Sequence, residues 1–273
     1  MRFRVDHDFH IHTYISPCAG EERFQQTTER ILQYAVENGL KTIIATDHFW
    51  DSPVSGNVGW YQDLELNFEK LSELNPLPQS EGVRFLFGCE TEMDQFQTIG
   101  LAKEHYNSFD FIIVPINHMH LEGISVPANW QAPVEERAEL FVKRFQVLLD
   151  SDLPLHKTGL AHMTDSLMAN ATWEDHIKTV DLIPDEVYKK LFNQAREKGL
   201  GIELNFRVKQ YTEEEMERIL RPYRIAKKCG CKFYLGSDAH RPVAFEGIRE
   251  NFEKIVDMLA LEETDKFHIC TQK

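Results

Sequence analysis

Cysteine is scarce in this sequence, with five residues among 273, at positions 18, 89, 229, 231 and 270. Small secreted domains that depend on disulfides carry a dense, even-numbered cysteine framework, so that class is excluded and we expect reduced thiols. Runs of eighteen apolar residues are also lacking, and the first residues show no apolar signal segment. We therefore expect a cytoplasmic protein with no membrane partner.

Basic residues are few relative to acidic ones. The chain has 30 Lys and Arg against 44 Asp and Glu, which gives a formal net charge of −14 with the 12 histidines neutral. This balance disfavours broad binding of nucleic acid, because phosphate backbones are held mainly by Lys and Arg. We expect a small phosphorylated partner rather than a long nucleic acid, and the sequence leaves the oligomeric state unknown.

Short apolar, β-branched segments alternate with segments of helical periodicity. The predicted strands are residues 8–13, 42–48, 84–92, 110–118, 158–163, 201–206 and 232–240, and the predicted helices are 27–39, 63–74, 134–150, 184–198, 213–228 and 244–260. Such alternation implies parallel strands joined by crossovers. We expect an α/β, TIM-like barrel in a single domain over residues 1–273, with an open doubly wound sheet as the alternative.

Almost every predicted strand ends in a side chain that can bind a metal ion. These residues are His10, His12, Asp47, His48, Glu90, Glu92, His118, His120, His162, Asn205, Asp238 and His240. Because the carboxyl ends of barrel strands converge, they can meet although they are far apart in sequence. A single histidine pair often has only a structural role, but agreement among five strand ends predicts a metal site.

The spacing of these residues indicates the kind of site. His10 and His12 are two residues apart, so an extended strand places both on one face, and Asp238 and His240 repeat the pattern. Mixed imidazole and carboxylate ligands suit Zn, Mn or Fe better than Mg or Ca. A carboxylate such as Glu90 could bridge two ions about 3.5 to 4 Å apart, with metal-activated hydroxide as the nucleophile.

Five segments of the chain resemble the polymerase and histidinol phosphatase (PHP) superfamily. They are DFHIHT at 8–13, TDH at 46–48, GCE at 88–90, GLAH at 159–162 and GSDAH at 236–240. The resemblance implies a distorted (β/α)7 barrel with a trinuclear metal centre. It also implies a metal-dependent hydrolase of phosphoric esters, with a small monoester like histidinol phosphate as the candidate substrate.

The resemblance also implies a role for individual residues. The first ion would be bound by His10, His12, Glu90 and Asp238, the second by Glu90, His118 and His162, and the third by His48 and His240. His120 shares a strand face with His118, and we favour His118 because it lies closer to the apolar run. Cys18 stands where histidinol phosphatase-like members have a further histidine for the third metal. It is either a thiolate ligand of that ion or a small buried hydrophobe, so two or three ions are expected.

Substrate binding and proton transfer are predicted less directly. Arg207 and Arg241 follow the last two strands and are the candidates for binding phosphate, with ordinary surface ion pairs as the alternative. Asp238 or His240 is expected to move a proton. Asp47 and Glu92 could orient the imidazoles. The competing functions are a phosphodiesterase or exonuclease acting on nucleotides and a noncatalytic metal-binding barrel.

Overall fold

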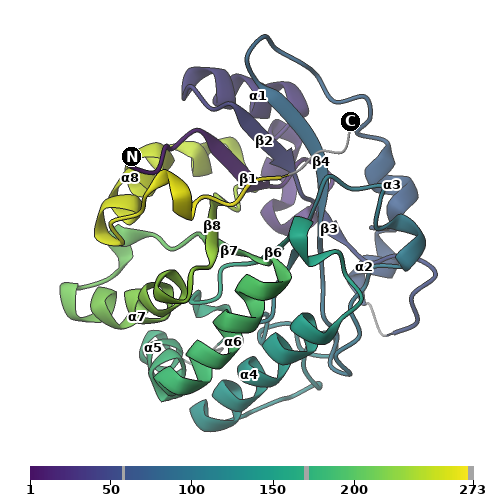
Figure 1. Cartoon of the computed structure of the whole chain (residues 1–273). Helices are drawn as coiled ribbons and strands as arrows, with labels where there is room; N and C mark the ends of the chain where they lie inside the picture. The colour runs from purple at the N-terminus through teal and green to yellow at the C-terminus, as the bar shows by residue number, and fades with distance from the viewer. Residues whose placement is uncertain (57–58, 169–171, 270–273) are drawn as a thin grey trace.

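The computed structural model describes residues 1–56, 59–168 and 172–269. Its strands form one parallel sheet at the centre of the molecule, with helices around the outside (Figure 1). In spatial order the strands are β1 (His7–Ile11), β2 (Thr42–Ala45), β4 (Arg84–Thr91), β5 (Phe111–Val114), β6 (Thr158–Leu160), β7 (Gly201–Leu204) and β8 (Lys232–Leu235). A short β3 (His48–Phe49) pairs with the carboxyl half of β4.

The first and last strands approach each other just beyond β8, which nearly closes the sheet. The amide of Asp238 donates to the carbonyl of His10 at 2.7 Å, and the amide of His12 donates to the carbonyl of Ala239 at 3.0 Å. The predicted (β/α)7 TIM-like barrel is therefore confirmed.

The helices begin and end at residues suited to those positions. The outer helices are α1 (Thr28–Glu37), α4 (Val134–Asp150), α5 (Trp173–Leu182), α6 (Asp185–Lys198), α7 (Glu213–Cys229) and α8 (Ile248–Met258). At the start of α7, Thr212 and Glu215 form a reciprocal capping box. Gly199 and Gly230 end α6 and α7 with φ of 78° and 83°, a conformation that glycine adopts without strain.

Three elements differ from the sequence prediction. The helix expected at 63–74 is two short helices, α2 (Trp60–Asp63) and α3 (Phe68–Ser72), and α5 was not predicted. The strand expected at 42–48 is interrupted between β2 and β3, where the Thr46 hydroxyl accepts from the Ile11 amide at 3.1 Å and Asp47 accepts from the Thr13 amide at 2.8 Å. Backbone bonds to both neighbouring strands persist there: the Thr46 amide donates to the Ile11 carbonyl at 2.8 Å, and the Glu90 amide donates to the Asp47 carbonyl at 3.0 Å.

Apolar side chains fill the inside of the barrel as well as the space between sheet and helices. A separate inner cluster contains Phe9, Ile44, Phe111, Ile113, Ala161, Tyr234 and Phe267. The rings of Phe111 and Tyr234 meet edge to face at 5.1 Å. Along the strands these residues precede the ligand-type side chains, which lie at the carboxyl end, whereas His7 is a buried polar residue at the amino end, with its ring 4.5 Å from Phe9.

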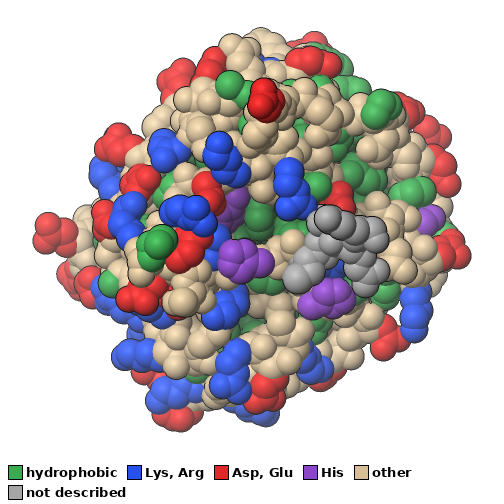
Figure 2. Space-filling model, turned by 45° about the horizontal axis from the view of Figure 1, so that its top comes forward, with side chains coloured by type: hydrophobic (Ala, Val, Ile, Leu, Met, Phe, Trp, Pro, Cys, Tyr) green, Lys and Arg blue, Asp and Glu red, His purple; other side chains and the backbone are tan. Residues whose placement is uncertain are grey.

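The surface carries mixed charge. On the face drawn in Figure 2, acidic and basic side chains lie interspersed. Among the described residues, no helix combines the length and apolar character that crossing a membrane requires. Cys18, Cys89, Cys229 and Cys231 are free thiols, and Cys270 lies outside the described residues.

A buried ion pair joins the start of β1 to the segment after α8. The Lys266 side chain is only 6% exposed, and its ammonium lies 2.9 Å from Asp6 and 3.1 Å from Glu263. Burial alone would raise the pKa of Asp6, but hydrogen bonds from His7 and Lys266 outweigh burial and hold that pKa well below its ordinary value. The charged form of Asp6 therefore stabilises the fold.

We expect Asp6→Asn to lower the free energy of unfolding at pH 7 by about 2 kcal/mol, because it leaves a buried ammonium with one carboxylate partner fewer. The pKa of Asp6 is lower in the folded chain than in the unfolded one. Its contribution is therefore complete above the unfolded value of about 3.9 and declines as the pH falls below it. Urea unfolding at pH 7 and pH 3 measures this.

The matched control is Glu250→Gln, which removes the exposed Glu250–Lys254 pair, and we expect it to change stability by less than about 0.5 kcal/mol. A difference between wild type and Asp6→Asn that is equally large at both pH values would contradict the prediction.

Candidate metal centre

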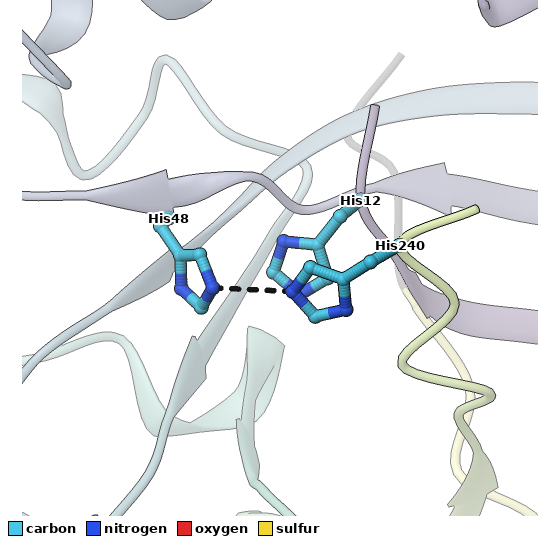
Figure 3. Close-up of side chains that lie close together, drawn as sticks. All are labelled: His12, His48 and His240. Atoms are coloured by element: carbon cyan, nitrogen blue, oxygen red, sulfur yellow. Dashed lines mark hydrogen bonds between the residues drawn. The ribbon is translucent and has the colours of Figure 1, made fainter. Parts of the chain in front are cut away.

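Side chains of the ligand type meet at the carboxyl end of the barrel. Three overlapping groups have ligand atoms within 4.8 Å of one another: His10, His12 and Asp238; His12, His48 and His240; and His10, Glu90 and His162. These groups share members, so they form one cluster, which we call the histidine cluster. Figure 3 shows His12, His48 and His240 converging from separate segments.

The histidine cluster is tightly packed, and most of its side chains are closed to solvent. His10 and His12 are fully buried, and Glu90 is 1% exposed. The Nε2 atoms of His10 and His12 lie 3.1 Å apart, and Nε2 of His12 lies 3.0 Å from Oδ1 of Asp238. Glu90 Oε2 lies 2.9 Å from His48 Nδ1, yet neither atom has a hydrogen-bond partner.

The outer ring nitrogen of most of these histidines is held by a fixed acceptor. The Nδ1 partners are Glu203 for His10 at 2.7 Å, Ser16 for His12 at 2.9 Å, Glu92 for His118 at 2.7 Å, Asn117 for His162 at 3.0 Å and the Asp238 carbonyl for His240 at 3.0 Å. A ring that donates from Nδ1 presents the lone pair of Nε2 on its other side. Neighbouring Nε2 atoms then repel unless a cation lies near both, so the donor set fits divalent metal ions.

The charge distribution also favours a cation. Burial raises the pKa of Glu90, but the nearby His10 and His48 outweigh it and lower this pKa well below its ordinary value. The pKa of Asp238 is likewise lowered well below its ordinary value, because His10 and His240 outweigh the effect of burial. Both carboxylates are therefore ionised in a buried site. Burial lowers the pKa of His10, but Glu203, Asp238 and Glu90 raise it well above the usual range, which reports their negative potential.

Cys18 lies at one side of the histidine cluster. It belongs to the 3-10 segment Pro17–Gln25, and although the residue is exposed, its Sγ lies 3.1 Å from His48 Nε2. Figure 3 marks the contact of His48 Nε2 with His240 Nε2, at 3.3 Å. Desolvation of the sulfur raises the Cys18 pKa, but His48 and His240 lower it to about 6. The thiol therefore lies where a thiolate can join the two imidazoles.

Of the two histidines after β5, His118 is the one beside the cluster. Its ring stacks on His162 with centroids 5.0 Å apart, whereas the ring of His120 lies 5.1 Å from that of His118 and is nearly perpendicular to it. The buried Arg144 of α4 holds the loop by donating to the carbonyls of Ile116, at 3.4 Å, and Ser125. This arrangement favours His118 over His120 as a ligand.

The two predicted phosphate-binding arginines lie outside the cavity that adjoins the cluster. Arg241 is exposed and pairs with Glu22 at 2.6 Å. Arg207 is half-buried and donates to the carbonyl of Ser237 at 3.3 Å. Asn205 donates to the carbonyl of Gly236 at 2.8 Å and is not part of the cluster. A role for Arg207 or Arg241 in binding substrate stays a prediction.

Three residues that hold the histidines were not singled out from the sequence; one is Asn117, which accepts from His162 Nδ1 at 3.0 Å. Glu203 of β7 is fully buried and accepts from His10 Nδ1 and from the amide of His162, the latter at 2.5 Å. It lies in the middle of an otherwise apolar strand segment. An acidic residue inside a buried parallel strand is unusual, and this feature of the sequence could have identified Glu203 as a residue with a buried partner. Nothing in the sequence around Ser16 indicates its role. Its hydroxyl accepts from His12 and donates to Asp47 at 2.6 Å, so Asp47 orients His12 through Ser16 rather than orienting its sequence neighbour His48.

The backbone after β8 follows a path that few residues can adopt. A Cβ atom on Gly236 would overlap the Glu203 carboxylate and lie 2.7 Å from Cβ of His10. Asp238 has a φ of 53°, a left-handed conformation that Asp tolerates better than most residues. The glycine therefore lets Glu203 reach His10, and the turn directs Asp238 into the cluster.

A parallel barrel with a buried cluster of histidines and carboxylates at its carboxyl end defines a metal-binding α/β barrel. The PHP domain family matches residues 8–207. The chain belongs to the PHP domain family, as the five sequence segments predicted.

Comparison with solved structures finds matches that are distant in sequence, and the first of them has the same fold. Histidinol phosphate phosphatase from Lactococcus lactis, solved with zinc, L-histidinol and phosphate, has a TM-score of 0.58 and 14% identity, and the match covers 96% of this chain and 98% of that one. A probable 2-pyrone-4,6-dicarboxylic acid hydrolase from Acinetobacter baumannii has a TM-score of 0.41 and 13% identity, covering 96% and 97%. No curated protein matches the sequence.

We expect Gly236→Ala to destabilise the protein by about 1–3 kcal/mol, because the added methyl group overpacks the contact between Glu203 and His10. The same change made in a Glu203→Ala background should cost less, because the overlapping carboxylate is gone. Urea unfolding of the four proteins in this double-mutant cycle measures the difference. Equal costs in both backgrounds would show that Glu203 is not what the methyl group meets.

Proposed function

We propose that this protein is a metal-dependent phosphoesterase that hydrolyses a small phosphate monoester. The observation that carries the proposal is the orientation of the buried histidines, whose outer nitrogens are already bonded while their inner nitrogens face one another and two ionised carboxylates. A histidinol phosphate phosphatase of the same fold holds zinc and phosphate, which is consistent with this function.

We assign the ligands as three overlapping sets. Ligands of the first ion would be His10, His12, Glu90 and Asp238; of the second, Glu90, His118 and His162; and of the third, His48, His240 and Cys18. The distances within the cluster and the position of the Cys18 sulfur support this assignment. Imidazole, carboxylate and thiolate together suit Zn, Mn or Fe.

Residues of the site would then have different roles in hydrolysis. Divalent ions bound there would acidify water and offset the charge of the phosphate. Asp238 has a carboxylate 26% exposed and 3.0 Å from His12, so it can pass a proton between the cluster and solvent. His240 lines the same cavity and is the alternative proton carrier. Glu203 and Glu92 fix the rings of His10 and His118 and exclude other orientations.

Metal analysis tests the centre directly. We expect the purified protein to hold three divalent transition metal ions, Cys18→Ser to lose one of them, and His12→Ala to lose more, because His12 lies in two of the three groups. In cobalt-substituted protein a thiolate-to-cobalt absorption band should be present and should vanish in Cys18→Ser. Cys229→Ser, a change at a thiol outside the cluster, is the control. Wild type without stoichiometric metal would refute the proposal.

Hydrolysis assays test the reaction. With Zn, Mn or Fe present, we expect a generic phosphate monoester to be hydrolysed at least about 100-fold faster than a phosphodiester of the same alcohol, on the scale of one transition-state interaction. A faster reaction with the diester would favour the phosphodiesterase alternative. Metal-loaded protein that turns over neither ester would favour the noncatalytic barrel.

A further inference from the structure

A second cavity lies at the amino end of the barrel, opposite the histidine cluster, and has a volume of about 180 Å³. The first residues of three neighbouring strands line it, His7 of β1, Thr42 of β2 and Arg84 of β4, and these residues pair in register. The segment after α8 bounds it, and the Phe267 amide holds that segment beside β8 by donating to the Phe233 carbonyl at 2.8 Å. Among the described residues, this cavity shares none with the one beside the histidine cluster.

Basic side chains outnumber acidic ones around the amino-end cavity. The described residues that line it include four basic and two acidic side chains, namely Arg4, Lys41, Arg84 and Lys266 against Asp6 and Glu263. The chain as a whole has the opposite balance, with a formal net charge of −14. A concave region lined by charge of one sign concentrates ions of the other sign. This end of the barrel therefore attracts small anions although the protein is acidic.

The two acids are already bonded to two of these cations. Glu263 Oε1 lies 2.7 Å from Arg4 Nη2 and 3.1 Å from Lys266 Nζ, and Asp6 Oδ1 lies 2.9 Å from Lys266 Nζ. Burial raises the pKa of Glu263, but hydrogen bonds from Arg4 and Lys266 outweigh burial and lower this pKa to about 2. A carboxylate stabilised in this way reports a positive potential around it. Within the described chain, neither acid forms an ion pair with Lys41.

Lys41 is the cation that an added ligand can engage. Its side chain is exposed and forms no hydrogen bond or ion pair with another described residue. Its backbone is fixed, because its amide donates to the Asp6 carbonyl at 2.6 Å and its carbonyl accepts from the Arg84 amide at 2.9 Å. A flexible ammonium on a fixed backbone can turn toward an anion in the cavity, and Lys binds phosphate as a point charge.

The dimensions of the cavity limit the ligand to a small anion. Pockets for drug-sized ligands span roughly 300–1,000 Å³, which is larger than this space. Arg4, Lys41 and Lys266 line it together, so several oxygens of one ligand can be approached by charged donors. A dianion matches the local excess of basic over acidic side chains, whereas a nucleic acid strand exceeds the volume.

We propose that the amino-end cavity is an anion site that binds a phosphate dianion through Lys41, with Arg4 and Lys266 beside it. The ligand is inorganic phosphate or the phosphoryl group of a small monoester. This site is separate from the histidine cluster and does not depend on the proposed function. A ligand there would contact both the strand starts and the segment after α8, so its binding would stabilise the folded chain.

Labelling of lysines tests the site at a single residue. Metal-loaded protein is treated with an amine-reactive reagent, and the rate at each lysine is read by peptide mass spectrometry. Because a bound anion would cover the Lys41 ammonium, we expect inorganic phosphate to slow its labelling about tenfold once the ligand is at about ten times its Kd. Lys190 of α6, exposed and without an ion pair among the described residues, is the matched control and should react at an unchanged rate.

Two further anions identify what is recognised. Methylphosphonate carries the dianion on a carbon group, as a monoester does, so protection by it as well as by phosphate assigns the site to the phosphoryl group of either source. Protection by phosphate alone assigns the site to the free ion. Chloride at the same ionic strength should give no protection, and equal protection by chloride would refute the site, because screening alone would explain it.

Titration of nitrogen-15-labelled, zinc-loaded protein with phosphate measures the affinity at this end of the barrel, from the amide signals of Thr42 and Phe267. We expect Lys41→Gln to weaken binding about tenfold, Lys41→Arg to restore it to within about threefold, and Lys190→Gln to leave it unchanged. An affinity that Lys41→Gln does not alter would overturn the proposal. Absence of ester hydrolysis with these signals still responding to phosphate would refute the proposed function alone.

Discussion

The Nε2 atoms of His10 and His12 lie 3.1 Å apart on two fully buried rings, and the rest of the site depends on this contact. The Nδ1 atom of each ring already donates a hydrogen bond, that of His10 to Glu203 and that of His12 to Ser16. Two lone pairs repel at this distance unless a proton or a metal ion lies between them. The buried carboxylates of Glu90 and Asp238 supply the matching negative charge, so the arrangement suits cations.

The barrel makes this arrangement possible because apolar and ligand-type side chains occupy different parts of its interior. Along the strands, aromatic and aliphatic side chains precede the ligand-type groups at the carboxyl end. A second layer of residues then fixes the rings: Glu92 holds His118, Asn117 holds His162, and Arg144 holds the loop that carries His118. Positions set in this way by neighbouring side chains are what metal chemistry requires, because small displacements of ligands lower affinity.

The sequence was sufficient for the barrel because apolar strands and amphipathic helices alternate with clear periods. It also pointed to the strand ends, since a histidine or acid there contrasts with the apolar residues before it. It was insufficient where long-range contacts decide. The buried face of α5 is half polar, with His176 and Thr179 beside Ile177 and Val180. The side chains of Thr46 and Asp47 bond to the end of β1, and Glu203 resembles an ordinary strand residue until His10 is placed beside it. The choice between His118 and His120 likewise depends on where the loop after β5 turns.

The bond from the Asp238 amide to the His10 carbonyl joins residues at opposite ends of the chain. During synthesis the first strand is made long before the last, so its two histidines have no Asp238 beside them until the chain has been made as far as the last strand. Contacts of such high sequence separation form late and slowly. Assembly of the metal-binding end of the barrel therefore coincides with completion of the fold, and a partly made chain would hold only fragments of the site.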